Sequence, residues 1–229
     1  MSLFVIGDTH LSLGTDKPMD LFRGWDNYVS RLTENWKKLV KPEDTVVIAG
    51  DISWAMKLED TYEDFCYINA LPGTKILLKG NHDYWWNTLS KINAYLEEKN
   101  FNTIKILYNN SFEVGEYVLC GTRGWTLDSQ TPEDKHILNR ECGRLRLSLE
   151  SAKASKKEPV VFLHYPPILG DTVCSDLIDI LIEYDVKRCY YGHIHGSNMI
   201  KGAFNGEFRG ITFKLISGDA VNFTPVLVR

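Results

Sequence analysis

Short polar clusters that follow strand-like runs constrain the fold of this chain more than any other feature of its sequence. The clusters contain five of the six histidines, together with aspartate, asparagine and glycine. They are Asp8-Thr9-His10, Gly50-Asp51, Gly80-Asn81-His82-Asp83, His164 and Gly192-His193-Ile194-His195-Gly196. Because ligands bind beyond the carboxyl ends of the strands in open α/β sheets, these clusters predict a site along one edge of a sheet.

Strand and helix patterns alternate through the first hundred residues. Short apolar runs predict buried strands at Leu3–Ile6, Thr45–Ala49 and Lys75–Lys79. Apolar residues at helical spacing predict helices at Trp25–Val40, Leu58–Leu71 and Tyr84–Lys99. Three rounds of strand, polar cluster and helix are typical of βαβ units with a largely parallel sheet.

The pattern changes after Ile104, where a mixed or second sheet is expected. Phe112–Val114 and Tyr117–Leu119 alternate in polarity and are joined by Gly115-Glu116, which is a hairpin signal. A helix is expected to begin at Thr131-Pro132 and to run to about Ser155. The remaining expected elements are strands at Val160–Leu163 and Arg188–Tyr191, a helix at Asp176–Tyr184 and antiparallel strands within Phe208–Val228. No linker or repeat interrupts the chain, so residues 1–229 are predicted to form a single domain.

Composition and charge argue against several classes of function. The formal net charge is −4 and the sequence pI is about 5.9, so no cationic surface for extended nucleic acid is expected. The chain has five cysteines and no CxxC pair, which is typical of free thiols and favours a reducing cytoplasm. Neither a signal-peptide pattern nor an apolar stretch long enough to cross a bilayer is present, so no membrane association is predicted.

The side chains in the clusters are those that bind divalent metals. Imidazole nitrogens, carboxylates and one carboxamide are suitable ligands for such cations. His193 and His195 are two residues apart, so both rings face the same way in extended backbone. A lone histidine is usually a hydrogen-bonded surface or core residue, and a lone aspartate often caps a helix. Five such clusters at equivalent strand ends favour a shared metal centre instead.

This ordered set of clusters resembles the calcineurin-like metallophosphoesterase superfamily, whose motifs are D-x-H, GD, GNH followed by Asp or Glu, a lone His, and GHxH. The matching motifs run from Asp8 to His195. The resemblance implies two divalent cations per chain, such as Mn²⁺, Fe²⁺ or Fe³⁺, or Zn²⁺. One would be held by Asp8, His10, Asp51 and His195, and the other by Asp51, Asn81, His164 and His193, with Asp51 bridging them.

The resemblance also implies a fold and a reaction. The fold would be of the α/β class, with two mixed β-sheets packed as a sandwich and helices outside. A hydroxide bridging the two cations would attack phosphorus. His82 would be the catalytic histidine, acting as a general acid or by stabilising charge, and Asp83 would orient its ring. For Asp83, capping of the helix expected from Tyr84 is an equally weighted alternative.

Two departures from the family's pattern bear on the substrate. Protein serine/threonine phosphatases carry an acidic residue three positions after the second motif's aspartate, whereas this chain has Trp54 there. It also has Asp83 where those phosphatases usually have glutamate. A dedicated protein phosphatase is therefore not favoured. No cysteine is followed six positions later by arginine, and neither a P-loop nor a G-x-G-x-x-G motif occurs, so other routes to phosphate chemistry have no support.

Candidate substrate contacts lie outside the clusters. Arg123 could bind a phosphate through its guanidinium group, and Trp125 could stack on a ring. The alternative, slightly favoured, is an arginine–carboxylate pair beside a packed tryptophan. The loops expected to govern substrate choice are Leu11–Gly24, Trp54–Leu58 and Thr122–Thr131.

The sequence thus favours a cytoplasmic, dinuclear metal-dependent phosphoesterase that acts on a small phosphate mono- or diester. A nuclease or cyclic-nucleotide phosphodiesterase with the same centre is the nearest alternative. A non-catalytic protein-binding scaffold of the same fold is less favoured, because every ligand position and His82 are present. The oligomeric state has no signal in the sequence.

Overall fold

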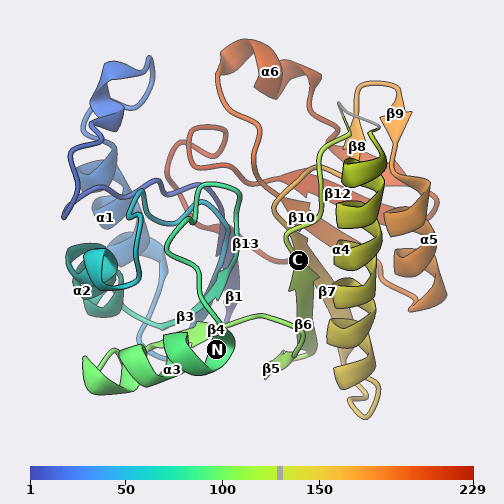
Figure 1. The fold of residues 1–229 in the computed structure, drawn as a ribbon, viewed down its shortest axis with the longest axis horizontal. Coiled ribbons are helices and arrows are strands. Elements are labelled where there is room, and N and C mark those ends of the chain that lie inside the picture. The colour runs from blue at the N-terminus through green and yellow to red at the C-terminus, as the bar shows by residue number, and fades with distance from the viewer. Residues whose placement is uncertain (128–130) are drawn as a thin grey trace.

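The computed structural model describes residues 1–127 and 131–229. Residues 128–130 belong to the predicted substrate loop Thr122–Thr131 and lie outside the described residues. Figure 1 shows two β-sheets side by side, with helices on their outer faces. The predicted fold class, two mixed sheets with flanking helices, is confirmed.

The first sheet has five strands in the order β13-β1-β2-β3-β4. Four strands are parallel neighbours, namely β1 (Leu3–Ile6), β2 (Thr45–Ala49), β3 (Thr74–Leu78) and β4 (Ile104–Ile106). The short strand β13 (Val226–Leu227) pairs antiparallel with β1. Every residue of β1 and β2 is buried, which explains why these strands read as unbroken apolar runs.

The second sheet has six strands in the order β11-β12-β10-β7-β6-β5. Its central neighbours run parallel, namely β12 (Ile211–Leu215), β10 (Arg188–Tyr191), β7 (Glu158–Leu163) and β6 (Tyr117–Thr122). The edge strands β11 (Gly206–Phe208) and β5 (Phe112–Val114) pair antiparallel. The hairpin predicted at Gly115-Glu116 is confirmed, whereas the tail is only partly antiparallel, because β12 adds in parallel to β10. A small separate sheet joins β8 (Ile168–Leu169) to β9 (Thr172–Val173).

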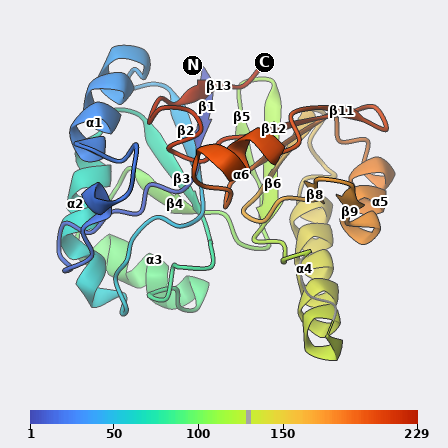
Figure 2. The same cartoon turned by 90° about the horizontal axis from the view of Figure 1, so that it is seen from above.

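Three apolar cores hold these layers together. The core between the sheets includes Val5 and Val47 from the first sheet and Phe162 from the second. The outer face of the first sheet packs against α1 (Tyr28–Leu39), α2 (Tyr62–Ala70) and α3 (Leu89–Glu98). The outer face of the second packs against α4 (Pro132–Ser151) and α5 (Ser175–Glu183). Figure 2 shows these two sets of helices on opposite sides of the molecule, with α6 (Ser197–Gly202) between them.

Two predicted helices start later than their sequence pattern suggested. The helix expected at Trp25–Val40 begins at Tyr28, because Asn27 adopts a left-handed conformation with φ of 51°. The helix expected at Tyr84–Lys99 begins at Leu89, where Thr88 accepts a hydrogen bond from the Lys91 N–H as its N-cap. The left-handed backbone at Asn27 thus delays the start of the first helix, and the N-cap Thr88 sets the start of the second.

Other helices follow their signals closely. The Thr131 side chain and Asp134 form a reciprocal capping box at the start of α4. The segment predicted as one helix at Leu58–Leu71 is divided into the short 3₁₀ helix η2 (Glu59–Thr61) and α2. A second 3₁₀ turn, η1 (Met19–Leu21), lies in the loop that follows β1.

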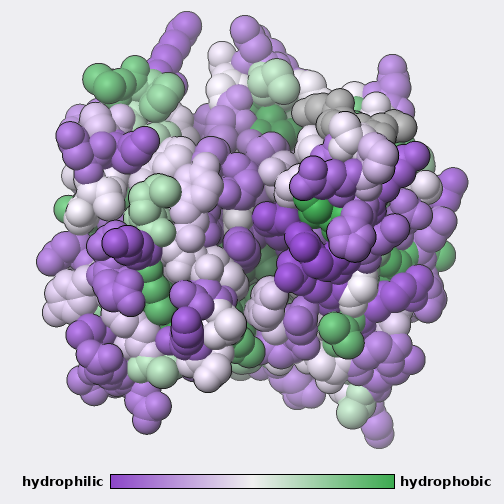
Figure 3. All heavy atoms as spheres, viewed as in Figure 1, coloured by the Kyte–Doolittle hydropathy of each residue, from purple (hydrophilic) through white to green (hydrophobic). Residues whose placement is uncertain are grey.

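The surface is largely hydrophilic on the face drawn in Figure 3, where hydrophobic side chains form small separate patches, one of them at the upper left. Within residues 1–127 and 131–229, every helix is too short or too polar to span a lipid bilayer.

Candidate metal centre

Strand ends from both sheets meet at one site. Asp8 and His10 follow β1, Asp51 follows β2 and Asn81 follows β3, all in the first sheet. His164 follows β7, and His193 with His195 follows β10, in the second sheet. The side chains form two groups, Asp8 with His10 and His195, and Asp51 with His164 and His193. Within each group the candidate ligand atoms all lie within 4.8 Å of one another.

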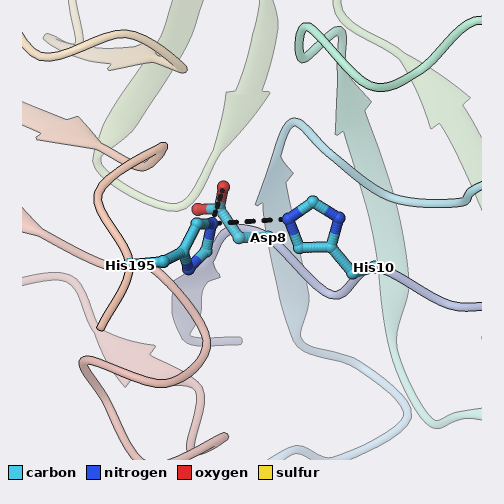
Figure 4. Close-up of side chains that lie close together, drawn as sticks. All are labelled: Asp8, His10 and His195. Carbon is cyan, nitrogen blue, oxygen red and sulfur yellow. Dashed lines mark hydrogen bonds and ion pairs between the residues drawn. The ribbon is translucent and has the colours of Figure 1, made fainter. Parts of the chain in front are cut away.

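The first group joins both sheets through three side chains (Figure 4). The Nε2 atom of His195 lies 3.1 Å from Oδ1 of Asp8 and 3.3 Å from Nε2 of His10. Asp8 and His10 are buried, whereas His195 is partly exposed. Two ring nitrogens and a carboxylate oxygen therefore converge where a bound cation would meet all three.

The second group contains an amide oxygen as well. Oδ1 of Asn81 lies 2.6 Å from Nε2 of His164 and 2.9 Å from Nδ1 of His193. Asp51 lies between the two groups, since its Oδ2 is 3.6 Å from Nε2 of His10 and 3.5 Å from Nε2 of His164. The structure thus brings together all seven side chains that the sequence suggested as metal ligands.

The backbone is constrained where it presents these side chains. Asp8, His10, Asp51 and His193 have positive φ angles of 57°, 42°, 50° and 71°. Left-handed backbone is uncommon for residues other than glycine, and it concentrates at functional sites where the surrounding structure holds it in place. The loops therefore accept local strain in order to direct these side chains to one point.

Two glycines allow the carboxylates to lie against the backbone. A Cβ atom on Gly80 would come within 2.1 Å of Oδ1 of Asp51. A Cβ atom on Gly192 would come within 2.4 Å of Oδ2 of Asp8. Only glycine fits at these two positions, which explains why both clusters carry it next to their ligand residues.

Two histidines are oriented by a second hydrogen bond. Nδ1 of His164 lies 3.2 Å from the carbonyl oxygen of Ala49, to which it donates. Nδ1 of His195 lies 3.0 Å from Oδ1 of Asp219, and Oδ2 of Asp219 accepts the N–H of Gly196 at 2.8 Å. A proton held on Nδ1 leaves Nε2 free to bind a cation, which is the usual way in which ligand histidines are positioned.

Asp219 is a functional residue that the sequence reasoning missed. It lies just beyond β12, in Ser217-Gly218-Asp219, so it shares the pattern of a strand followed by glycine and aspartate. The signal was present, but the tail was predicted to be antiparallel. In the structure β12 runs parallel to β10, which brings its carboxyl end to the site.

The electrostatics of the centre suit bound cations. Burial, together with the neighbouring carboxylates of Asp8 and Asp83, raises the pKa of Asp51 to about 9. Burial lowers the pKa of His164 to about 3, so its ring is neutral at physiological pH. Burial alone would raise the pKa of Asp8, but its interactions with His195, His164 and His10 together lower it. Once a cation has displaced their protons, the carboxylates and imidazoles form an oxygen and nitrogen donor set that fits divalent metals.

His82 lies at the border of the centre without joining either group. Its backbone N–H donates to Oδ1 of Asp51 at 2.7 Å. Its ring is half-buried, with the Trp54 ring centroid at 4.5 Å, and its Nδ1 lies 3.3 Å from the hydroxyl of Tyr84. The ring lines a cavity that opens beside His10 and His195. The structure thus places His82 where it can reach a molecule bound next to the centre.

The predicted roles of Asp83 require a correction. Its carboxylate accepts the backbone N–H groups of Gly80 and Ile52 at 2.7 and 2.8 Å, and the Trp85 ring N–H at 3.0 Å. These donors occupy the Asp83 carboxylate. Among the described contacts it therefore neither binds the His82 ring nor caps α3. Asp83 instead ties the loop after β2 to the loop after β3, and it thereby positions Asp51 and Asn81.

Arg123 and Trp125 have structural partners. Nη2 of Arg123 lies 3.7 Å from Oε1 of Glu141, and the guanidinium stacks 4.7 Å from the centroid of the Trp125 ring. The Trp125 ring N–H donates to Asp134 at 3.0 Å. These contacts anchor both side chains to α4, which is the arrangement that the sequence slightly favoured over substrate contact.

The chain matches one family model. The model is described as calcineurin-like phosphoesterase, and it covers residues 1–197. This range includes all seven candidate ligands and His82, but not Asp219. Among curated proteins no match was found.

Solved structures share the fold. A protein of unknown function from Aquifex aeolicus matches with a TM-score of 0.55 and 20% identity, over 99% of this chain and 95% of its own. A phosphopantetheinyl hydrolase from Mycobacterium tuberculosis matches with a TM-score of 0.56 and 12% identity, over 94% and 88%. A protein from Thermus thermophilus matches with a TM-score of 0.58 and 10% identity, over 99% and 97%. At these identities the similarity concerns the fold alone.

Proposed function

This chain belongs to the calcineurin-like phosphoesterase family, and from that premise we propose that it hydrolyses a small phosphate mono- or diester at a centre that holds two divalent cations. Family membership makes it a metal-dependent phosphoester hydrolase. The number of cations and the type of ester go beyond that statement and rest on the geometry of the site.

The position of Asp51 carries the proposal of two cations. One of its oxygens lies within 3.6 Å of a ring nitrogen in each group, His10 in one and His164 in the other. A carboxylate so placed can contribute to both sites. Its pKa of about 9 reflects burial beside the carboxylates of Asp8 and Asp83. Bound cations would neutralise the negative charge of these carboxylates.

Each proposed cation would have four ligands. The first would be held by Asp8, His10, Asp51 and His195, and the second by Asp51, Asn81, His164 and His193. Mixed nitrogen and oxygen donors suit Mn²⁺, iron or Zn²⁺. When bound, such a pair lowers the pKa of water and withdraws charge from phosphate oxygens.

The protein's own groups would position the substrate and transfer the proton. His82 faces the space beside the first group, so its ring can approach the oxygen of a departing alcohol or an oxygen on phosphorus. Asp83 and Asp219 would act indirectly. Asp83 holds the loops that carry Asp51 and Asn81, and Asp219 holds the ring of His195. A buried, pre-ordered arrangement of this kind needs little reorganisation during the reaction.

The proposed setting is a reducing cytoplasm, and the proposed partner is a small phosphorylated molecule. All five cysteines are free, which supports the compartment. The net charge of −4 gives no support to binding of extended nucleic acid.

Hydrolysis of aryl phosphate esters tests the proposal. Protein stripped of metal with a chelator and then supplied with Mn²⁺ should release nitrophenolate from bis(p-nitrophenyl) phosphate or from p-nitrophenyl phosphate. The stripped protein should not. A folded protein that binds Mn²⁺ but hydrolyses neither ester would contradict the proposal and would favour a scaffold role.

A further inference from the structure

Two cavities border the metal centre. The larger has a volume of about 800 Å³ and is lined by His10, His82 and His195 on the side of the centre. The smaller has a volume of about 250 Å³ and is lined by His193 and His195. His195 and Met199 line both, so the two cavities adjoin where the centre lies between them.

The larger cavity has mainly apolar walls. Its apolar lining residues are Met19, Phe22, Trp25, Trp54, Met199 and Ile200. Phe22 and Met199 each keep 58% of their surface exposed, although exposure of large apolar side chains is unfavourable in a free protein. A ligand that covers them would remove that surface from water.

The larger cavity has three Arg or Asp side chains in its wall, and two of them, Arg31 and Asp219, already have partners. Arg31 donates to the carbonyl oxygen of Gly24 at 2.9 Å and to Asn222, and its guanidinium lies 4.8 Å from the centroid of the Phe223 ring. Arg23 and Asp219 are the other charged residues among those that line the cavity. Ser197, Asn198 and Asn222 add polar groups to the wall, but most of the accessible lining surface is apolar, so the cavity suits a largely apolar group.

The smaller cavity is apolar as well. Its walls include Leu127, Tyr165, Pro166, Leu169 and Ile194. A volume of about 250 Å³ accommodates one ring or a short alkyl group. The two cavities therefore offer unequal apolar spaces on the two sides of the same centre.

We propose that the substrate is a phosphodiester with two apolar arms, the larger bound in the cavity beside His82 and the smaller in the cavity beside His193. This inference rests on the proposed function, because it takes the phosphorus to lie at the metal centre. A phosphodiester has two ester oxygens that diverge from phosphorus, so its arms can enter both cavities. A monoester has one arm and would leave one cavity empty. Hydrolysis would add the hydroxyl of water to phosphorus and its proton to one ester oxygen, giving an alcohol and a monoester.

Phosphinates with different arms test the cavities without a reaction. Dimethylphosphinate, methyl(phenyl)phosphinate and diphenylphosphinate carry the same single negative charge and cannot be hydrolysed. Calorimetry with the Mn²⁺-loaded protein should show affinity rising by roughly 10-fold or more for each phenyl group, the gain expected from burying an aromatic ring. Equal affinities for the three would overturn the proposal.

Substitutions assign each arm to its cavity. Phe22→Ala should lower the affinity for diphenylphosphinate about 3- to 10-fold and leave the affinity for dimethylphosphinate unchanged. Leu21→Ala is the matched control, because Leu21 is 81% exposed beside Phe22 and does not line the cavity. For the smaller cavity, Leu169→Ala should lower the affinity for diphenylphosphinate. Val173→Ala, on the paired strand and outside that cavity, is the control and should leave the affinity unchanged. Equal effects of Phe22→Ala and Leu21→Ala would overturn the assignment of the larger cavity.

Kinetics separate the failure of this inference from failure of the proposed function. With the same leaving group, kcat/KM should be higher for bis(p-nitrophenyl) phosphate than for p-nitrophenyl phosphate. If the protein hydrolyses only the monoester, the diester inference is wrong while the phosphoesterase function stands. If neither ester is hydrolysed and no phosphinate binds, both are wrong.

Discussion

Nδ1 of His195 lies 3.0 Å from Oδ1 of Asp219, a residue that follows a different strand of the same sheet. The contact leaves Nε2 of His195 directed toward Asp8 in the metal centre. It thereby links the end of the chain, beyond the range of the family model, to the first group of ligands.

Asp219→Ala should weaken metal binding at the first group by about 10- to 100-fold, the usual cost of losing a partner that orients a ligand histidine. The histidine that Asp219 orients belongs to the first group, so the second group should keep its affinity. Titration with Mn²⁺ in competition with a chelator measures both sites. Asp171→Ala, in an exposed turn between β8 and β9, is the control, and a loss of equal size there would contradict the assigned role.

Asp51→Asn should nearly abolish hydrolysis, because a neutral carboxamide is a poor bridge between two cations. His136→Ala is the control, since His136 is exposed on α4 and lies outside both groups. Steady-state rates with a nitrophenyl ester and metal content are measured for each variant. Similar activity in the two variants would contradict the shared role of Asp51.

His82→Ala should lower kcat by roughly 10²- to 10³-fold while the metal content stays unchanged, because the ring faces the substrate space but belongs to neither ligand group. If the ring protonates the leaving group, the loss should shrink for phenols of low pKa. If it stabilises charge on phosphoryl oxygens, the loss should hardly depend on the phenol. Loss of one cation from the variant would instead make His82 a ligand.

Metal binding near pH 7 should release protons, because at least two ligand groups of the metal-free protein hold one. In the metal-free protein, burial and neighbouring carboxylates raise the pKa of Asp51 to about 9. The pKa of His195 is raised to about 10, because Asp8 and Asp219 outweigh the opposing effect of burial. Both groups therefore hold a proton at pH 7 that a cation must displace, whereas His164, with a pKa of about 3, holds none.

The apparent affinity for metal should accordingly rise with pH and level off only above about pH 9 to 10, where both groups have lost their protons. Calorimetry at one pH in two buffers of different protonation enthalpy counts the protons released. Affinity that is constant between pH 6 and 8, with no proton release, would contradict this account of the centre.

The strands that carry the ligands could be predicted from local sequence. Val46, Val47 and Ile48 form an apolar run because β2 is buried on both faces, and the following Gly50-Asp51 marks its end. The same reasoning located the ends of β1, β3, β7 and β10. Every candidate ligand follows one of these strands, so the metal centre was the most predictable part of the molecule.

What the sequence did not predict depends on contacts between distant segments. β12 could equally have paired antiparallel along its whole length, and only its parallel pairing with β10 brings Asp219 to His195. The role of Asp83 was missed for a similar reason, because its hydrogen-bond donor at Ile52 belongs to a loop 31 residues earlier. The shapes of the cavities have no sequence signal. The loops expected to govern substrate choice do contribute to their walls, with Phe22 and Trp54 in the larger cavity and Leu127 in the smaller one.

The stoichiometry of bound metal tests the central claim most directly. Purified protein loaded mildly with Mn²⁺ and freed of excess ion should contain two cations per chain by elemental analysis, because there are two ligand groups and Asp51 lies within 3.6 Å of a ring nitrogen in each. Circular dichroism of the same sample confirms that it is folded. A reproducible value of one or none in folded protein would contradict the dinuclear centre.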